Sequence, residues 1–230
     1  MNSFFRQIAT RSLSVALLMA GLFLSLPAPA QEALTVNAEA GNNTFSAVFD
    51  APLGERINAV SSSVRCDLSY DDKTVKASGT CSVPLTSIMV DNEETKTEHF
   101  RDWVTNKKTK PEACRFEAKF DGVRLSEPLV PDKTAKFTAD VPFTVCGRPR
   151  TDGRKEHVEG TALLIPGSEP KTIKIRAHIS NFNRDAYQIG PKYTAGWLAR
   201  VQSLAKVVAE EGTVDLTVFA KPNLQPRGGQ

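Results

Sequence analysis

The chain has 230 residues, and its 29 lysines and arginines nearly balance its 26 aspartates and glutamates. The first thirty residues hold two arginines and no acidic residue, so the rest of the chain carries a formal net charge of +1. A charge this close to zero excludes the strongly basic class of nucleic-acid-binding proteins, and the remaining length suits one all-β domain.

The N-terminal segment 1–30 has the pattern of a secretory signal peptide. Two arginines precede an apolar run over residues 13–26, and small residues at the cleavage position end at Ala30. The run is shorter than the roughly 20 apolar residues of a membrane-spanning helix. We therefore expect cleavage near Ala30 and a periplasmic or secreted protein that keeps no stable membrane span.

The first strand pair expected after this segment surrounds the turn-forming residues 71–74. Apolar and polar residues alternate on both sides of the turn, over 64–70 and 75–85, as is typical of half-buried strands. Pairing the two strands across the turn places Cys66 directly opposite Cys81. Because disulfides form in exported proteins, this register predicts a disulfide between them.

The other two cysteines, Cys114 and Cys146, form the second disulfide by elimination. Cys114 shares the apolar face of its strand, whereas Cys146 falls on the polar face of its own. A slip of one residue exchanges the two faces of a strand, so we expect a β-bulge near Pro142 or Gly147. No closely spaced cysteine and histidine ligands occur, and no metal site is predicted.

Five later segments also alternate apolar with polar residues and are predicted to be strands: 116–120, 137–145, 158–164, 173–179 and 214–218. No βαβ repeat occurs, which predicts an all-β fold, an extended antiparallel barrel of about eight strands. Between the last two strands, apolar residues recur at helical spacing from Trp197 to Val208. This amphipathic helix is expected to cap an open end or cover a sheet edge, with membrane docking as the alternative. Residues 221–230 should form a flexible tail.

Large apolar side chains gather on one face of the predicted strands. Such a face packs into a filled core or lines a cavity, and an eight-stranded barrel can hold one small ligand. The pattern alone favours packing. The residues concerned are Phe45, Phe49, Phe116, Phe120, Val141, Phe143, Ile175, Ile179 and Leu216.

Charged runs and histidines offer few candidates for chemistry. The acidic run over 91–94 and the basic run over 107–110 are interpreted as solvated loops. His178 alternates with basic residues on a solvated strand face. No nucleophile elbow, P-loop, zinc-protease helix or dinucleotide-binding glycine pattern occurs, and no spacing supports a catalytic triad around His99. We expect that the protein is not an enzyme.

Three stretches carry patterns of a known family: Ser87-Ile88 followed by a polar run, His99-Phe100, Pro111 and Phe116; Phe143-Thr144-Val145-Cys146-Gly147; and Asn183-Arg184-Asp185-Ala186-Tyr187-Gln188-Ile189. Together they resemble the YceI-like lipid-binding domains, which are exported proteins with an extended, lipocalin-like antiparallel barrel. The resemblance covers residues 44–220.

The resemblance implies a barrel domain over residues 31–220 whose tubular apolar cavity holds a polyisoprenoid tail or a similar amphiphile. It favours cavity lining for the nine inward residues. We interpret His99 as a head-group contact or a proton donor, or as a histidine that fixes a loop by hydrogen bonding. Arg184 is interpreted as an anchor of the barrel end or as a partner of an anionic head group. The chain departs from the family at Cys146, usually histidine, and at Gln188, often glycine.

These inferences together predict an extracytoplasmic, non-catalytic carrier that binds a lipid and uses no cofactor. One alternative is an envelope protein-interaction module with a filled barrel, and a hydrolase is the less favoured one. An exposed apolar patch would point to the interaction module. The identity of the lipid and the oligomeric state, monomer or homodimer, stay open.

Overall fold

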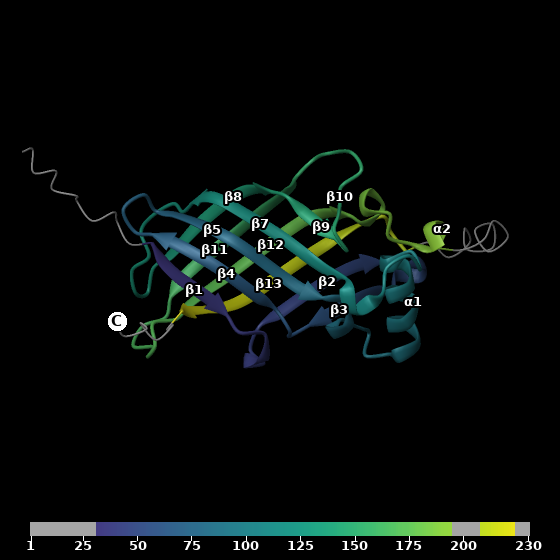
Figure 1. Cartoon of the computed structure of the whole chain (residues 1–230), viewed down its shortest axis with the longest axis horizontal. Helices are drawn as coiled ribbons and strands as arrows, with labels where there is room; N and C mark the ends of the chain where they lie inside the picture. The colour runs from purple at the N-terminus through teal and green to yellow at the C-terminus, as the bar shows by residue number, and fades with distance from the viewer. Residues whose placement is uncertain (1–30, 195–207, 224–230) are drawn as a thin grey trace, which may run out of the picture.

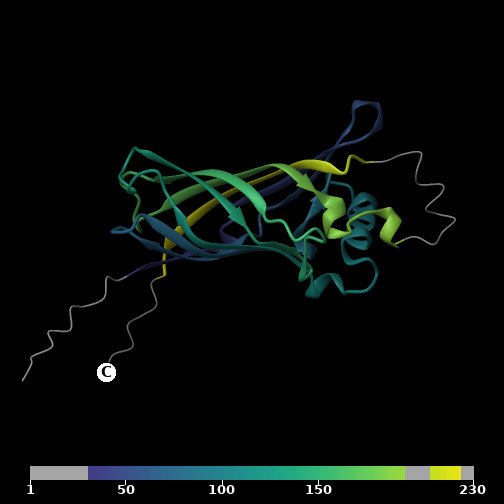
Figure 2. The same cartoon turned by 90° about the horizontal axis from the view of Figure 1, so that it is seen from above.

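The computed structural model describes residues 31–194 and 208–223. They form an elongated, strongly curled β structure with two helices at one end (Figures 1 and 2). The predicted signal peptide, residues 195–207 of the predicted amphipathic helix and residues 224–230 lie outside the described residues. None of the described helices is long and apolar enough to span a membrane.

The described elements are thirteen strand segments, two α-helices and short 3₁₀ turns. The strands are β1 (Glu32–Val36), β2 (Thr44–Asp50), β3 (Arg56–Ser61), β4 (Arg65–Asp71), β5 (Lys76–Pro84), β6 (Met89–Val90), β7 (Arg115–Arg124), β8 (Thr134–Val141), β9 (Phe143–Val145), β10 (Arg148–Pro149), β11 (Glu156–Leu164), β12 (Ile173–Asn183) and β13 (Glu211–Pro222), and the helices are α1 (Glu94–Thr105) and α2 (Pro191–Thr194).

All strands belong to one antiparallel sheet. The main path runs β10-β9-β7-β5-β4-β1-β13-β12-β11-β8, and β2, β3 and β6 branch from β13. The sheet curls so that β8 returns beside β7, where Leu125 and Phe137 form an isolated bridge. We call the end of this barrel that carries α1 and α2 the helix end, and the end that carries the β4–β5 turn the turn end (Figure 1).

The five predicted strand segments coincide with β7, β8 with β9, β11, β12 and β13. The all-β antiparallel fold is therefore confirmed. The number of segments exceeds eight because some long strands are interrupted, as β8 and β9 are at Pro142. β13 continues to Pro222 and pairs with Leu34 and Thr35 of β1. The first two residues of the predicted tail thus belong to a strand.

The β4–β5 hairpin has the register that the alternation predicts. Cys66 pairs directly with Cys81, and the two form a disulfide with their Cα atoms 4.1 Å apart. Both cysteines are buried. The disulfide therefore joins two adjacent strands on the buried inner face of the barrel.

Removing this disulfide with Cys66→Ala and Cys81→Ala should lower the free energy of unfolding by about 3 kcal/mol, because the loop it closes constrains the unfolded chain. The Cys114–Cys146 disulfide closes a longer loop, so its removal should cost slightly more. Urea unfolding of the two double variants measures both losses. A Cys66/Cys81 variant as stable as the unmodified protein would contradict the expectation.

The Cys114–Cys146 disulfide is also present, with its Cα atoms 4.4 Å apart, but the bulge expected near Pro142 or Gly147 is wrong. The alternation of buried residues continues through Pro142, from Val141 to Phe143 and Val145. The face changes instead at Cys146, which lies just beyond β9 and has a positive φ of 49°. This left-handed conformation turns the side chain towards Cys114 without an inserted residue.

Glycine permits one close approach inside the barrel. Gly160 on β11 stands opposite Phe137 on β8. A Cβ atom at Gly160 would collide with the Phe137 ring and with the Arg176 carbonyl oxygen. The absence of a side chain therefore lets the ring lie across the inner face of β11.

Helix α1 was not predicted from the sequence; it begins at Glu94, the last residue of the acidic run, and residues 92–94 of that run are exposed as expected. Its start is tied to β6 by Thr97, whose hydroxyl accepts a hydrogen bond from the Val90 N–H at 2.9 Å and donates to the Glu93 carbonyl at 2.7 Å. The helix ends at Thr105, and the next residue, Asn106, takes a left-handed conformation as the C-cap.

Candidate ligand-binding site

Three apolar cavities follow one another along the inside of the barrel. The turn-side cavity has a volume of about 70 Å³, the central cavity about 50 Å³ and the helix-side cavity about 40 Å³. Phe120 and Leu216 line both the turn-side and the central cavity, and Phe45, Phe116 and Phe143 line both the central and the helix-side cavity. The cavities therefore adjoin in a single file.

The structure brings all nine residues predicted from the strand faces to the walls of these cavities. The turn-side cavity is lined by Phe120 (β7), Ile175 (β12) and Leu216 (β13), and the central cavity by Phe116 (β7), Val141 (β8), Phe143 (β9) and Ile179 (β12). Phe45 and Phe49 of β2 line the helix-side cavity. Their contact with a ligand stays a prediction.

Aromatic rings divide the interior between the central and helix-side cavities. The Phe116 ring lies 5.9 Å from the ring of Phe45 and 6.4 Å from that of Phe143. Phe143 in turn makes an edge contact with Phe182 at 5.5 Å. A lipid tail that extends through both cavities must displace these rings, because the rings lie between the cavities. Each cavity alone has the volume of only a few water molecules.

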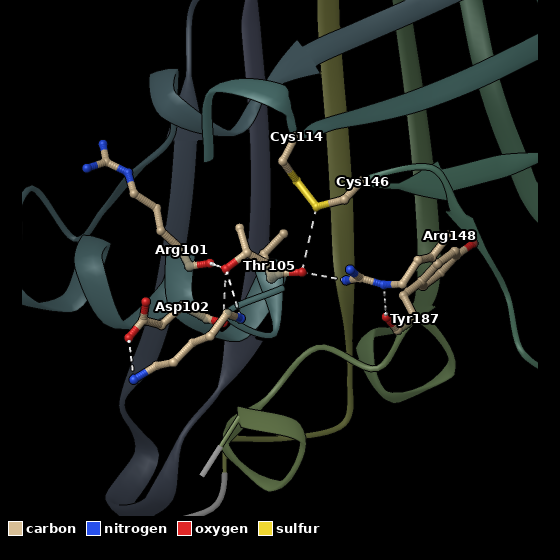
Figure 3. The surroundings of a disulfide bond; sticks show 9 residues. Arg101, Asp102, Thr105, Cys114, Cys146, Arg148 and Tyr187 are labelled. Carbon is tan, nitrogen blue, oxygen red and sulfur yellow. Dashed lines mark hydrogen bonds and ion pairs between the residues drawn. A yellow bond between two sulfur atoms is a disulfide. The ribbon is translucent and has the colours of Figure 1, made fainter. Parts of the chain in front are cut away.

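Helix α1 forms part of the wall at the helix end, where its Phe100 and Trp103 line the helix-side cavity. Figure 3 shows how the end of α1 is attached: Arg148 donates a hydrogen bond to the Val104 carbonyl oxygen, and the Cys146 sulfur lies 3.7 Å from the same oxygen. The disulfide sulfur carries no hydrogen, so its approach is a contact and Arg148 is the donor. Arg148 and the disulfide thus hold α1 over the cavity.

Arg184 is buried at the helix end and lines the helix-side cavity. Its guanidinium donates hydrogen bonds to three backbone carbonyls, those of Ala209 at 2.9 Å, Ile189 at 2.7 Å and Val208 at 2.6 Å. Burial lowers the pKa of Arg184. The structure therefore gives Arg184 the anchoring role, through carbonyls, of the two roles that the resemblance implies.

A buried polar network lies beside this anchor and was not predicted from the sequence. One Glu156 carboxylate oxygen accepts hydrogen bonds from Arg150 and from the Tyr187 hydroxyl, both at 2.7 Å. Burial and the nearby Glu156 carboxylate raise the pKa of Tyr187. The Tyr187 ring stacks on Phe182 at 5.2 Å, so the network is rigidly joined to the aromatic lining.

Asp152 extends the network towards the surface. It accepts two hydrogen bonds from the Arg150 side chain, at 2.9 and 2.8 Å, and two from Arg154, from the backbone N–H at 3.1 Å and from Nε at 2.9 Å. The Arg150 guanidinium holds the pKa of Asp152 well below its usual range. Asp152 therefore stays ionised while most carboxylates of the unfolded chain take up protons.

Asp152→Asn should reduce the loss of stability in acid. Because its pKa is lower in the folded protein, Asp152 contributes stability above the unfolded pKa of about 3.9 that disappears as the pH falls towards the folded value. Urea unfolding between pH 7 and pH 2 should show a flatter decline for this variant. The matched control is Asp67→Asn, an exposed strand residue, which should keep the original slope. An unchanged slope for both would contradict the expectation.

The histidines lie away from the cavities. His99 is exposed on α1 and lines none of them, and its predicted contact with a lipid head group stays a prediction. His157 pairs with Asp140 at 3.0 Å and His178 with Asp215 at 2.8 Å on the outer face. The described residues that line the three cavities include no histidine, aspartate or glutamate.

Neither a protein-family model nor a curated protein matches the chain. Solved structures do match it, among them that of a polyisoprenoid-binding domain from Saccharophagus degradans implicated in plant cell wall breakdown. The TM-score is 0.52 at 13% sequence identity, over 83% of this chain and 99% of the other. The chain has the fold of this polyisoprenoid-binding domain. The fold implied by the YceI-like resemblance is thereby confirmed.

Proposed function

We propose that the mature protein is an extracytoplasmic, non-catalytic carrier that holds the apolar tail of a polyisoprenoid, or of another amphiphilic lipid, inside the barrel. The observation that carries the proposal is the file of three adjoining apolar cavities, lined by the residues that strand alternation points inward. The likeness to a polyisoprenoid-binding domain supports it. Two disulfides fit an oxidising compartment outside the cytoplasm.

The energetics of tail burial are sufficient for binding. Each buried methylene contributes about 0.8 kcal/mol, so ten tail carbons supply roughly 8 kcal/mol, against an association cost of at least about 4 kcal/mol. Part of the gain is spent on moving the Phe116 and Phe143 rings between the cavities. We therefore expect these rings to change rotamer when a long tail is bound.

Protein purified from its native envelope, extracted with organic solvent and analysed by mass spectrometry, should yield close to one lipid per chain. The delipidated, folded protein should then bind a fluorescent polyisoprenoid. The matched control is the same protein unfolded in urea, which should bind none. Absence of both extracted lipid and probe binding would overturn the carrier function.

The narrowness of the cavities favours one second candidate, a module that binds another envelope protein through a filled barrel. In that case the phenylalanine rings stay in place, and the interior has no ligand to release. A folded protein that yields no lipid and binds no probe would support this function in place of the carrier.

A further inference from the structure

The barrel wall has a seam between β7 and β8. At one end of the seam the pairing of β7 with β9 stops, and the last hydrogen bond there is donated by the Lys119 N–H to the Pro142 carbonyl oxygen at 3.0 Å. At the other end the Ser126 backbone N–H donates a hydrogen bond to the Lys136 carbonyl oxygen at 2.7 Å, beside the isolated Leu125–Phe137 bridge. Between these points the described residues of β7 and β8 form no ladder pair with each other.

A change of register keeps the seam unpaired. The register of β7 with β9 and the register of the Leu125–Phe137 bridge differ by one residue. The extra residue lies in a bulge of β7 that includes Gly122, which has a φ of 60° and donates its N–H to Ser78 of β5 at 2.8 Å. The bulge thus directs a backbone donor away from β8.

Charge also opposes pairing at the seam. The β7–β9 register, continued along β8, would put Asp121 opposite Asp140, and both are exposed. Two like charges directly opposite each other destabilise a strand pair. By contrast, the other edge of β8 is paired with β11 over eight consecutive residues.

Cavity walls lie directly behind the seam, and both ends of the barrel are covered. Phe120 and Val123 of β7 and Phe137 of β8 line the turn-side cavity. At the helix end α1 covers the helix-side cavity. At the turn end the loop between β7 and β8 folds across, where the Leu129 N–H donates to the Tyr70 hydroxyl at 3.2 Å.

We propose that this seam is a lateral portal through which the apolar tail of a lipid enters and leaves the barrel. The inference rests on the proposed carrier function. Separation of β7 from β8 breaks the Leu125–Phe137 bridge and the hydrogen bonds between Ser126 and Lys136. By comparison, β8 and β11 are joined by a ladder of eight residue pairs, and β4 and β5 by a ladder of seven. A tail that enters sideways also reaches the turn-side and central cavities without being threaded from an end.

Crosslinking across the seam tests the portal. All four cysteines are held in disulfides, so a short bis-maleimide reacts only with thiols that are introduced, here by Asp121→Cys with Asp140→Cys. The matched control is Thr161→Cys with Arg176→Cys, an outward pair on the hydrogen-bonded β11–β12 wall. Each variant is also capped with N-ethylmaleimide, which modifies the same thiols without joining them.

The crosslinked seam should slow the association of a fluorescent polyisoprenoid at least tenfold in stopped-flow measurements, and slow dissociation by the same factor, because a blocked route affects both directions. The capped variants and the crosslinked control should keep their rates within twofold. If the Asp121/Asp140 variant does not fold, Arg124→Cys with Thr138→Cys takes its place beside the bridge.

Two failures are distinguishable. Binding at an unchanged rate after complete crosslinking of the seam overturns the portal alone and assigns access to a barrel end. Failure of the unmodified, delipidated protein to bind the probe overturns the carrier function, and the portal with it.

Discussion

Replacing Arg184 with alanine is expected to lower the free energy of unfolding by about 3 to 5 kcal/mol, because the change leaves three buried carbonyls without their donor. These carbonyls belong to the chain just before β13 and to Ile189, so the helix end of the barrel should loosen first. Urea unfolding followed by circular dichroism measures the loss.

Two controls sharpen this prediction. Arg184→Lys should recover only part of the stability, because an ammonium cannot reproduce the spread of the guanidinium across three carbonyls. Arg154→Ala removes an arginine whose side chain is 75% exposed, and it should change stability by less than about 0.5 kcal/mol. A loss below about 1 kcal/mol for Arg184→Ala would contradict the anchoring role and leave head-group binding as its function.

Ile175→Asp is expected to weaken binding of a fluorescent polyisoprenoid by about a hundredfold or more, because it places a carboxylate without a partner in the turn-side cavity. The same substitution on the outer face, Thr217→Asp on β13, provides the matched control. Its affinity should stay within twofold of the unmodified protein. Fluorescence titration of the delipidated proteins measures both affinities.

Folding must be separated from binding in this experiment, since a buried charge also destabilises a protein. Near-ultraviolet circular dichroism of the Ile175→Asp protein, recorded at the temperature of the titration, shows whether the aromatic interior is intact. A folded Ile175→Asp protein that binds with unchanged affinity would place the tail outside the turn-side cavity.

The sequence predicts the strands of this protein well because a half-buried strand has a period of two residues. The turn at 71–74 and the two cysteines specify a single register for β4 and β5, and the structure has it. The same alternation identifies all nine inward residues that line the cavities. Each of these inferences depends only on neighbours in the chain or on one tight turn.

Helix α1 escaped prediction because the segment contains few apolar residues and starts in an acidic run. Its position depends on partners far away in the chain, above all Arg148 and the Cys114–Cys146 disulfide. The expected bulge failed for a related reason, since one left-handed residue, Cys146, changes the face without disturbing the strand. Local alternation does not report such a backbone conformation.

The sequence by itself determined which residues face the interior, which cysteines pair and which architecture follows, because alternation and turns act over a few residues. Only the tertiary structure decided that the inward residues leave three cavities, that Arg184 bonds to carbonyls and that β7 and β8 part at a seam. Those features arise where segments distant in sequence meet, and there packing volume, hydrogen-bond partners and register depend on both segments at once.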